Sequence, residues 1–129
     1  MLAIQITGFY AGILALIFIA ASINIIKLRF RHKVGIGDGE VSELAKAIRG
    51  HANFAEFVPL ALILMAIAEA NNISSTMLHS CGALLVAGRV SHLIGLAKTK
   101  GSSIPRALGV FSTYGVILAC AIANILNYL

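Results

Sequence analysis

The chain has 129 residues, and its composition excludes an ordinary soluble domain. Hydrophobic residues make up 59% of it and charged residues only 12%, and the mean hydropathy is +0.93. The formal net charge is +5, but nucleic-acid binding requires a basic face on a soluble surface, which so apolar a chain does not offer. We therefore expect no nucleic-acid partner. These values predict an all-α integral membrane protein.

Four apolar runs are each long enough, at about 20 residues, to cross a bilayer as a helix. They fill most of the chain, which predicts one domain over residues 1–129, folded as a bundle of four transmembrane helices. The predicted spans are Gln5–Ile26, Leu44–Ala70, Ser74–Leu96 and Ile104–Leu126. No Lys or Arg precedes Lys27, so the first run lacks the positive segment of a cleaved signal peptide and is expected to be retained.

The basic residues predict the topology. All of them lie around the first and third predicted connections, and the second connection and both ends of the chain have none. They are Lys27, Arg29, Arg31, Lys33, Lys46 and Arg49, followed by Arg89, Lys98, Lys100 and Arg106. Because basic loops tend to stay in the cytoplasm, we expect both termini on the non-cytoplasmic side.

Small residues recur within the predicted helices. Gly8 and Gly12 form a GxxxG pair in the first span, and Gly115 begins a similar stripe in the fourth. Such stripes let helices approach closely in lipid. Cys81 and Cys120 lie toward the outer ends of the third and fourth spans, where we expect apolar packing, with a disulfide left open.

The second predicted helix carries a ladder of polar residues. Lys46, Arg49, Asn53 and Glu56 are spaced three or four apart and therefore share one face. The apolar run that follows, residues 57–68, is too short to span a bilayer alone. Glu56 must therefore lie within or just below the hydrocarbon boundary, where fixed polar groups usually face a bundle interior or a wet cavity.

Two interpretations of this ladder remain open. In the first, Arg49 and Glu56 form a clamp between helices, Asn53 bridges it, and no ligand binds. In the second, the surplus of basic residues over the single carboxylate of Glu56 creates a cleft for an anion. The charge balance favours the second interpretation.

A further polar cluster is predicted at the same end of the bundle. Arg89 and His92 are three residues apart on one face of the third span, and Arg106 follows Pro105 in the first turn of the fourth. The predicted topology brings Arg49, Arg89 and Arg106 to the same side of the membrane. No His or Cys spacing resembles a metal site, so we expect no metal.

The ladder resembles the MAPEG family, the membrane-associated proteins in eicosanoid and glutathione metabolism. Its core pattern, Arg–x–x–x–Asn–x–x–Glu–x–x–Pro, is met by Arg49, Asn53, Glu56 and Pro59. The resemblance covers essentially the whole chain, and the segment from VGIGDGE through LAKAIRGHANFAEFVPL looks like the bacterial branch. It implies four-helix subunits that assemble as homotrimers, in this case in a bacterial inner membrane.

The resemblance also implies a glutathione site in clefts between neighbouring subunits, near the cytoplasmic side. The implied binding residues are Arg49, Asn53, Glu56, Arg89 and His92. Arg49 would face the carboxylates of glutathione and Glu56 its α-amino group, and Arg106 would be the catalytic residue that stabilises the thiolate. The implied function is a membrane-bound glutathione transferase or peroxidase-like enzyme acting on hydrophobic electrophiles, with glutathione as co-substrate.

The chain departs from the better-known members at three positions. Phe57, His92 and Leu96 stand where mammalian members commonly have tyrosines, and His92 can replace only one of those hydroxyl groups. Two alternatives therefore stay open. One is a non-catalytic membrane scaffold or lipid-binding protein of the same fold, and the other is an enzyme that uses a different thiol or an anionic lipid.

Overall fold

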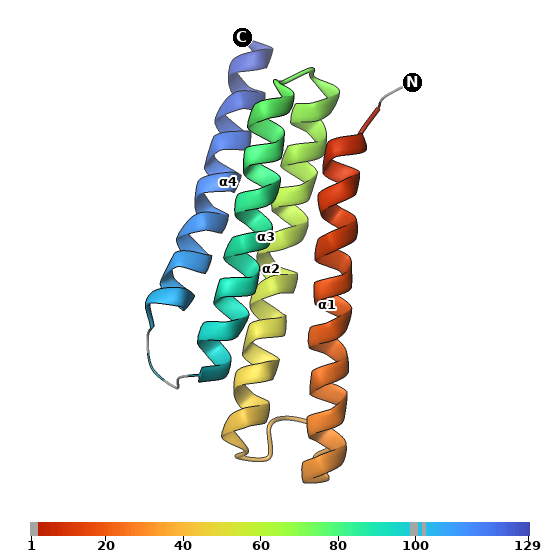
Figure 1. Ribbon diagram of the computed structural model, residues 1–129, viewed down its shortest axis with the longest axis vertical. Helices are drawn as coiled ribbons and strands as arrows, with labels where there is room; N and C mark the ends of the chain where they lie inside the picture. The colour runs from red at the N-terminus through yellow and green to blue at the C-terminus, as the bar shows by residue number, and fades with distance from the viewer. Residues whose placement is uncertain (1–2, 99–100, 102) are drawn as a thin grey trace.

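The computed structural model describes residues 3–98, 101 and 103–129, and this part of the chain is built from four long helices (Figure 1). They are α1 (Gln5–His32), α2 (Ser42–Ala70), α3 (Ser75–Lys98) and α4 (Ile104–Tyr128). Each has the length and apolar composition to cross a membrane. The predicted all-α bundle of four transmembrane helices is confirmed.

The helices run up and down, with α2 and α3 between α1 and α4 (Figure 1). Within the described residues, α1 packs on α2 and α3, α4 packs on the same two helices, and α1 does not contact α4. Both chain ends and the α2–α3 connection lie at one end of the bundle. The α1–α2 and α3–α4 connections lie at the other, which we call the basic end.

The basic end collects the positive charge that the sequence placed around the first and third connections. Its described members include Arg29, Arg31, Lys33, Lys46 and Lys98, and Lys100 lies outside the described residues. α1 continues to His32, beyond the predicted span, and ends where Lys33 adopts a left-handed conformation with φ of 54°. The guanidinium of Arg29 then donates to the carbonyl oxygen of Gly37 at 2.9 Å, which holds the connection against α1.

The core lies along the centre of the bundle and draws on all four helices. Its buried members are Leu14, Phe54, Val58, Ala61, Met65, Cys81, Leu85, Val116 and Cys120. The sulfur atoms of Cys81 and Cys120 are 3.9 Å apart, both residues are buried, and both are free thiols. They pack as apolar residues, as the sequence predicted.

Glycines allow α3 and α4 to pack closely toward the basic end. A Cβ atom on Gly109 would lie 2.5 Å from the carbonyl oxygen of Gly88 and 2.5 Å from the Cβ atom of His92. A Cβ atom on Gly88 would lie 2.8 Å from the Cβ atom of Ser112. Because real Cβ atoms essentially never approach so closely, larger residues here would push the two helices apart.

The glycine stripes that the sequence singled out do not serve this purpose inside the subunit. Around Gly8, Gly12 and Gly115, nothing lies within 4 Å of a Cβ atom built on the backbone. These three glycines therefore make no close contact between helices within one subunit. The close α3–α4 contact uses other glycines, among them Gly88 and Gly109, which lie on different helices and so form no GxxxG pair.

At the end opposite the basic end, Glu69 of α2 caps the start of α1. Its carboxylate oxygens accept hydrogen bonds from the backbone N–H groups of Ile6 and Thr7, at 2.8 and 2.7 Å. The first turn of a helix has unpaired N–H groups and a partial positive charge, so a carboxylate is a favourable partner. Glu69 thus has a structural role that the sequence did not reveal.

We predict that Gly109→Ala will destabilise the bundle by about 1–3 kcal/mol, because the new methyl group overpacks the α3–α4 contact. Gly115→Ala, on the same helix but with open space around it, should be neutral or stabilising by up to about 1 kcal/mol. The unfolding free energy can be measured by circular dichroism during a denaturing-detergent titration in mixed micelles. Equal effects of the two substitutions would contradict this account.

Candidate functional site

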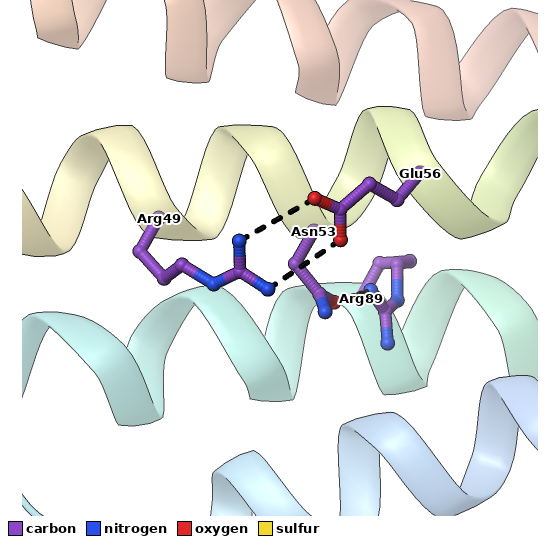
Figure 2. Close-up of polar contacts among 4 residues, drawn as sticks. All are labelled: Arg49, Asn53, Glu56 and Arg89. Atoms are coloured by element: carbon purple, nitrogen blue, oxygen red, sulfur yellow. Dashed lines mark hydrogen bonds and ion pairs between the residues drawn. The ribbon is translucent and has the colours of Figure 1, made fainter.

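The polar ladder lies on α2, which continues without a break through Pro59 (Figure 2). Arg49 Nη1 is 3.4 Å from Glu56 Oε1, and Arg49 Nη2 is 3.5 Å from Glu56 Oε2. This ion pair joins two residues of the same helix, so the interpretation of Arg49 and Glu56 as a clamp between helices is wrong for the single subunit. The pair is open, since 60% of the Arg49 side chain and 48% of the Glu56 side chain are exposed.

Asn53 points away from this ion pair, toward α3 and Arg89 (Figure 2). The Arg89 guanidinium donates from Nη1 to Asn53 Oδ1 at 2.7 Å and from Nη2 to the carbonyl oxygen of Gly109 at 2.8 Å. Arg89 is only 1% exposed, and its Nε has no hydrogen-bond partner. Arg89 therefore ties α2, α3 and α4 together with neutral partners.

His92 lies next to this tie, 5% exposed, with Nδ1 3.3 Å from the backbone carbonyl oxygen of Arg106. A carbonyl oxygen only accepts hydrogen bonds, so Nδ1 carries the proton and donates. The His92 ring therefore lies against the first turn of α4, and His92 and Arg106 line one groove. The other two arginines are held elsewhere. Arg89 is buried against Asn53 and Gly109, and Arg49 pairs with Glu56 on the exposed side of α2.

Arg106 begins α4 next to a small groove. Ser103 accepts a hydrogen bond from the Arg106 N–H at 3.4 Å, which caps the helix, and Pro105 occupies its first turn. The Arg106 guanidinium donates to the carbonyl oxygen of Gly101 at 2.6 Å and has no carboxylate partner among the described residues. It lines a groove of about 500 Å³ together with His92 and Phe111.

Lys46 makes no ion pair with the other residues of the ladder and faces a different part of the subunit. It lines a different groove, between α1, α2 and α3. Of the positions lacking a tyrosine hydroxyl, Leu96 is buried, and Phe57 packs edge-on against Tyr114 of α4 with ring centroids 5.5 Å apart. Tyr114 thus brings a phenol ring against Phe57, a contact that sequence reasoning missed because α4 is distant in the chain.

The depth of the ion pair follows from the length of the apolar run beyond it. Residues 57–68 of α2 rise only about 18 Å, against about 30 Å for the hydrocarbon layer. We therefore expect Glu56 within or just below the hydrocarbon boundary, and its side chain is half exposed in the subunit. Within the described residues, no three His, Cys, Asp or Glu side chains are grouped as metal ligands would be.

Four transmembrane helices, with an open ion pair on one of them and a buried arginine that links three of them, define a polytopic membrane protein with polar residues inside its helical bundle. Its sequence matches the pattern of the MAPEG family over residues 7–126, and the chain belongs to this family. It is 35% identical over 121 residues to "Inner membrane protein YecN" of Escherichia coli strain K12. The match covers 94% of this chain and 91% of that protein, and the protein of the same name from Escherichia coli O6:H1 matches equally well.

We predict that Asn53→Ala will destabilise the fold by about 1.5–3 kcal/mol, because it leaves a buried guanidinium N–H without a partner. Asn53→Ala combined with Arg89→Met should cost less than the sum of the two single changes, by about 0.5–3 kcal/mol. Arg31→Met, at the exposed Arg31–Glu43 pair of the basic end, should cost less than about 1 kcal/mol and serves as the control. Unfolding free energies in mixed micelles test this cycle, and strict additivity would show that the Asn53–Arg89 bond does not contribute.

Proposed function

We propose that this protein is a glutathione-dependent enzyme of the inner membrane, which activates the glutathione thiol for transferase or peroxidase-like reactions with hydrophobic substrates. Membership of the MAPEG family supports the class, and the similar Escherichia coli proteins, named as inner membrane proteins, support the location. The observation that carries the proposal is the Arg49–Glu56 pair, which is half open and expected within or just below the hydrocarbon boundary.

The pair has the chemistry to bind a zwitterionic peptide. Glutathione has two carboxylates and an α-ammonium group, and Arg49 and Glu56 present one positive and one negative group 3.4 Å apart. On binding, Arg49 exchanges the Glu56 carboxylate for a ligand carboxylate, and Glu56 accepts from the ligand ammonium. One exposed ion pair is thus replaced by two, in a cleft from which the ligand excludes water.

Arg106 supplies the charge for the reactive step. A thiol is a poor nucleophile until it loses its proton, and a nearby guanidinium stabilises the thiolate that forms. Arg106 meets this need because no described carboxylate neutralises it. In the transferase reaction the thiolate sulfur then attacks the electrophilic carbon, the new C–S bond forms, and the leaving group departs with the bonding electrons.

We place this site between the subunits of a homotrimer, as in the family that the ladder resembles. Lipid cannot solvate an ion pair, so the open side of Arg49 and Glu56 requires protein or water against it. The unoccupied space at Gly8 and Gly12 provides a surface of α1 on which a neighbouring helix can pack closely. With the basic end in the cytoplasm, the site opens toward cytoplasmic glutathione and both termini lie on the other side.

A second candidate is a non-catalytic scaffold of the same fold. The hydrogen bonds of Arg89 favour this alternative. Its Nη1 and Nη2 groups already donate to Asn53 and to the Gly109 carbonyl oxygen of the same subunit, and the side chain is only 1% exposed. In this alternative the polar residues hold helices together and no thiol binds.

The proposal is tested by titrating glutathione into detergent-purified protein and following thiolate absorbance in the ultraviolet near neutral pH. We expect a saturable thiolate signal in the unaltered protein. Arg106→Ala should still bind glutathione but lose at least about 90% of the thiolate signal, because each unit of thiol pKa gained lowers the thiolate fraction up to tenfold.

A second pair of variants separates binding from activation. Arg49→Gln should weaken glutathione binding by about tenfold or more, the loss of a charge-assisted hydrogen bond worth at least about 1.5 kcal/mol. Lys27→Gln removes a charge at the same end of the bundle, outside the site, and should leave binding unchanged. Absence of any binding to folded, trimeric protein would reject the proposal in favour of the scaffold.

A further inference from the structure

A second cavity lies in the subunit, away from the Arg49–Glu56 pair. It is a groove of about 530 Å³ between α1, α2 and α3, within the size range of small-molecule sites. Small residues form much of its lining, among them Ala20 and Ala21 of α1 and Ala47 of α2. At its base Gly50 lets α3 approach, since a Cβ atom there would lie only 3.0 Å from Leu93 Cδ2.

The groove has one polar end and one apolar end. Its α1 wall runs from Ile17 to Leu28, about 16 Å along the helix, which is close to half of the roughly 30 Å hydrocarbon layer. Its charged lining residues, Glu43 and Lys46, both lie in the first turns of α2, at the basic end. The remaining lining is apolar apart from Asn24.

The charge at the polar end of the groove is positive. The Glu43 carboxylate lies 3.9 Å from Arg31 Nη1 and 3.6 Å from His32 Nε2, and it pairs with these two residues. Lys46 is half-buried and has no carboxylate partner among the described residues. An amine on a flexible stem, held at the edge of an apolar groove, can reach an anionic group at the membrane surface.

We propose that this groove binds one acyl chain of an anionic phospholipid, with the lipid phosphate against Lys46. The length of the groove matches the depth of a single leaflet, its apolar end points toward the bilayer centre, and its positive end lies where the phosphate of that lipid would be. Anionic lipids are attracted to basic groups at this level. The site is separate from the proposed glutathione site, because none of the residues proposed for glutathione lines this groove.

The experiment is native mass spectrometry of the delipidated full-length protein, titrated with phosphatidylglycerol or with phosphatidylcholine carrying the same acyl chains. We expect one tightly bound phosphatidylglycerol per subunit and at least about fivefold weaker binding of phosphatidylcholine. Glycerol phosphate, the headgroup alone, should not bind, because the apolar groove contributes nothing to it.

Two variants and two matched controls locate the site. Lys46→Gln should weaken phosphatidylglycerol binding about fivefold, to the level of phosphatidylcholine, and Lys27→Gln should not change it. Ala21→Phe fills the groove and should remove the tight lipid, whereas Ala83→Phe makes the same change on an exposed face of α3, outside the groove, and should retain it.

Three outcomes would overturn the proposal. Equal binding of the two phospholipids would mean non-specific surface lipid, and equal loss in Lys46→Gln and Lys27→Gln would mean attraction to the whole basic end. A change of oligomeric state in Ala21→Phe, with lipid binding unaltered, would mean that a second copy of the chain occupies the groove.

Discussion

The hydrogen bonds of the buried Arg89 guanidinium are the interactions on which the rest of the site depends. A charge at this depth is costly unless its N–H groups have partners, and the partners here come from two other helices, Asn53 of α2 and the backbone of Gly109 in α4. The requirement for those partners fixes how α2, α3 and α4 lie relative to one another. The positions of the remaining polar groups follow from that arrangement.

Gly109 shows how packing and polarity combine. Its missing side chain lets α3 approach, and its carbonyl oxygen accepts from Arg89 and also from the Thr113 hydroxyl, at 2.8 and 2.9 Å. A larger residue at this position would collide with two groups of α3, the Gly88 carbonyl oxygen and the His92 side chain. The same close contact therefore brings His92 to the start of α4, beside Arg106.

The polar face of α2 divides into three parts with different surroundings. Arg49 and Glu56 stay open on the outside of the subunit, Asn53 turns inward to Arg89, and Lys46 lines the groove beside α1. This division follows from the angular spread of a helix face that has three neighbouring helices around it. One face therefore contributes to an open ion pair, an internal tie and the lining of a groove.

The sequence by itself determined the number of membrane spans, their order and the polar ladder, because hydrophobic length and helical spacing are local properties. It identified Arg49, Asn53, Glu56, Arg89, His92 and Arg106 as the residues of interest. Only the tertiary structure decided their partners: that Arg49 pairs along its own helix, that Asn53 turns to Arg89, and that Glu69 caps α1. The contacts of Asn53 and Glu69 depend on how helices that are distant in the chain pack together, and no spacing within one helix encodes that. The Arg49–Glu56 pair lies within one helix, but the neutral partners that occupy Asn53 and Arg89 come from tertiary packing.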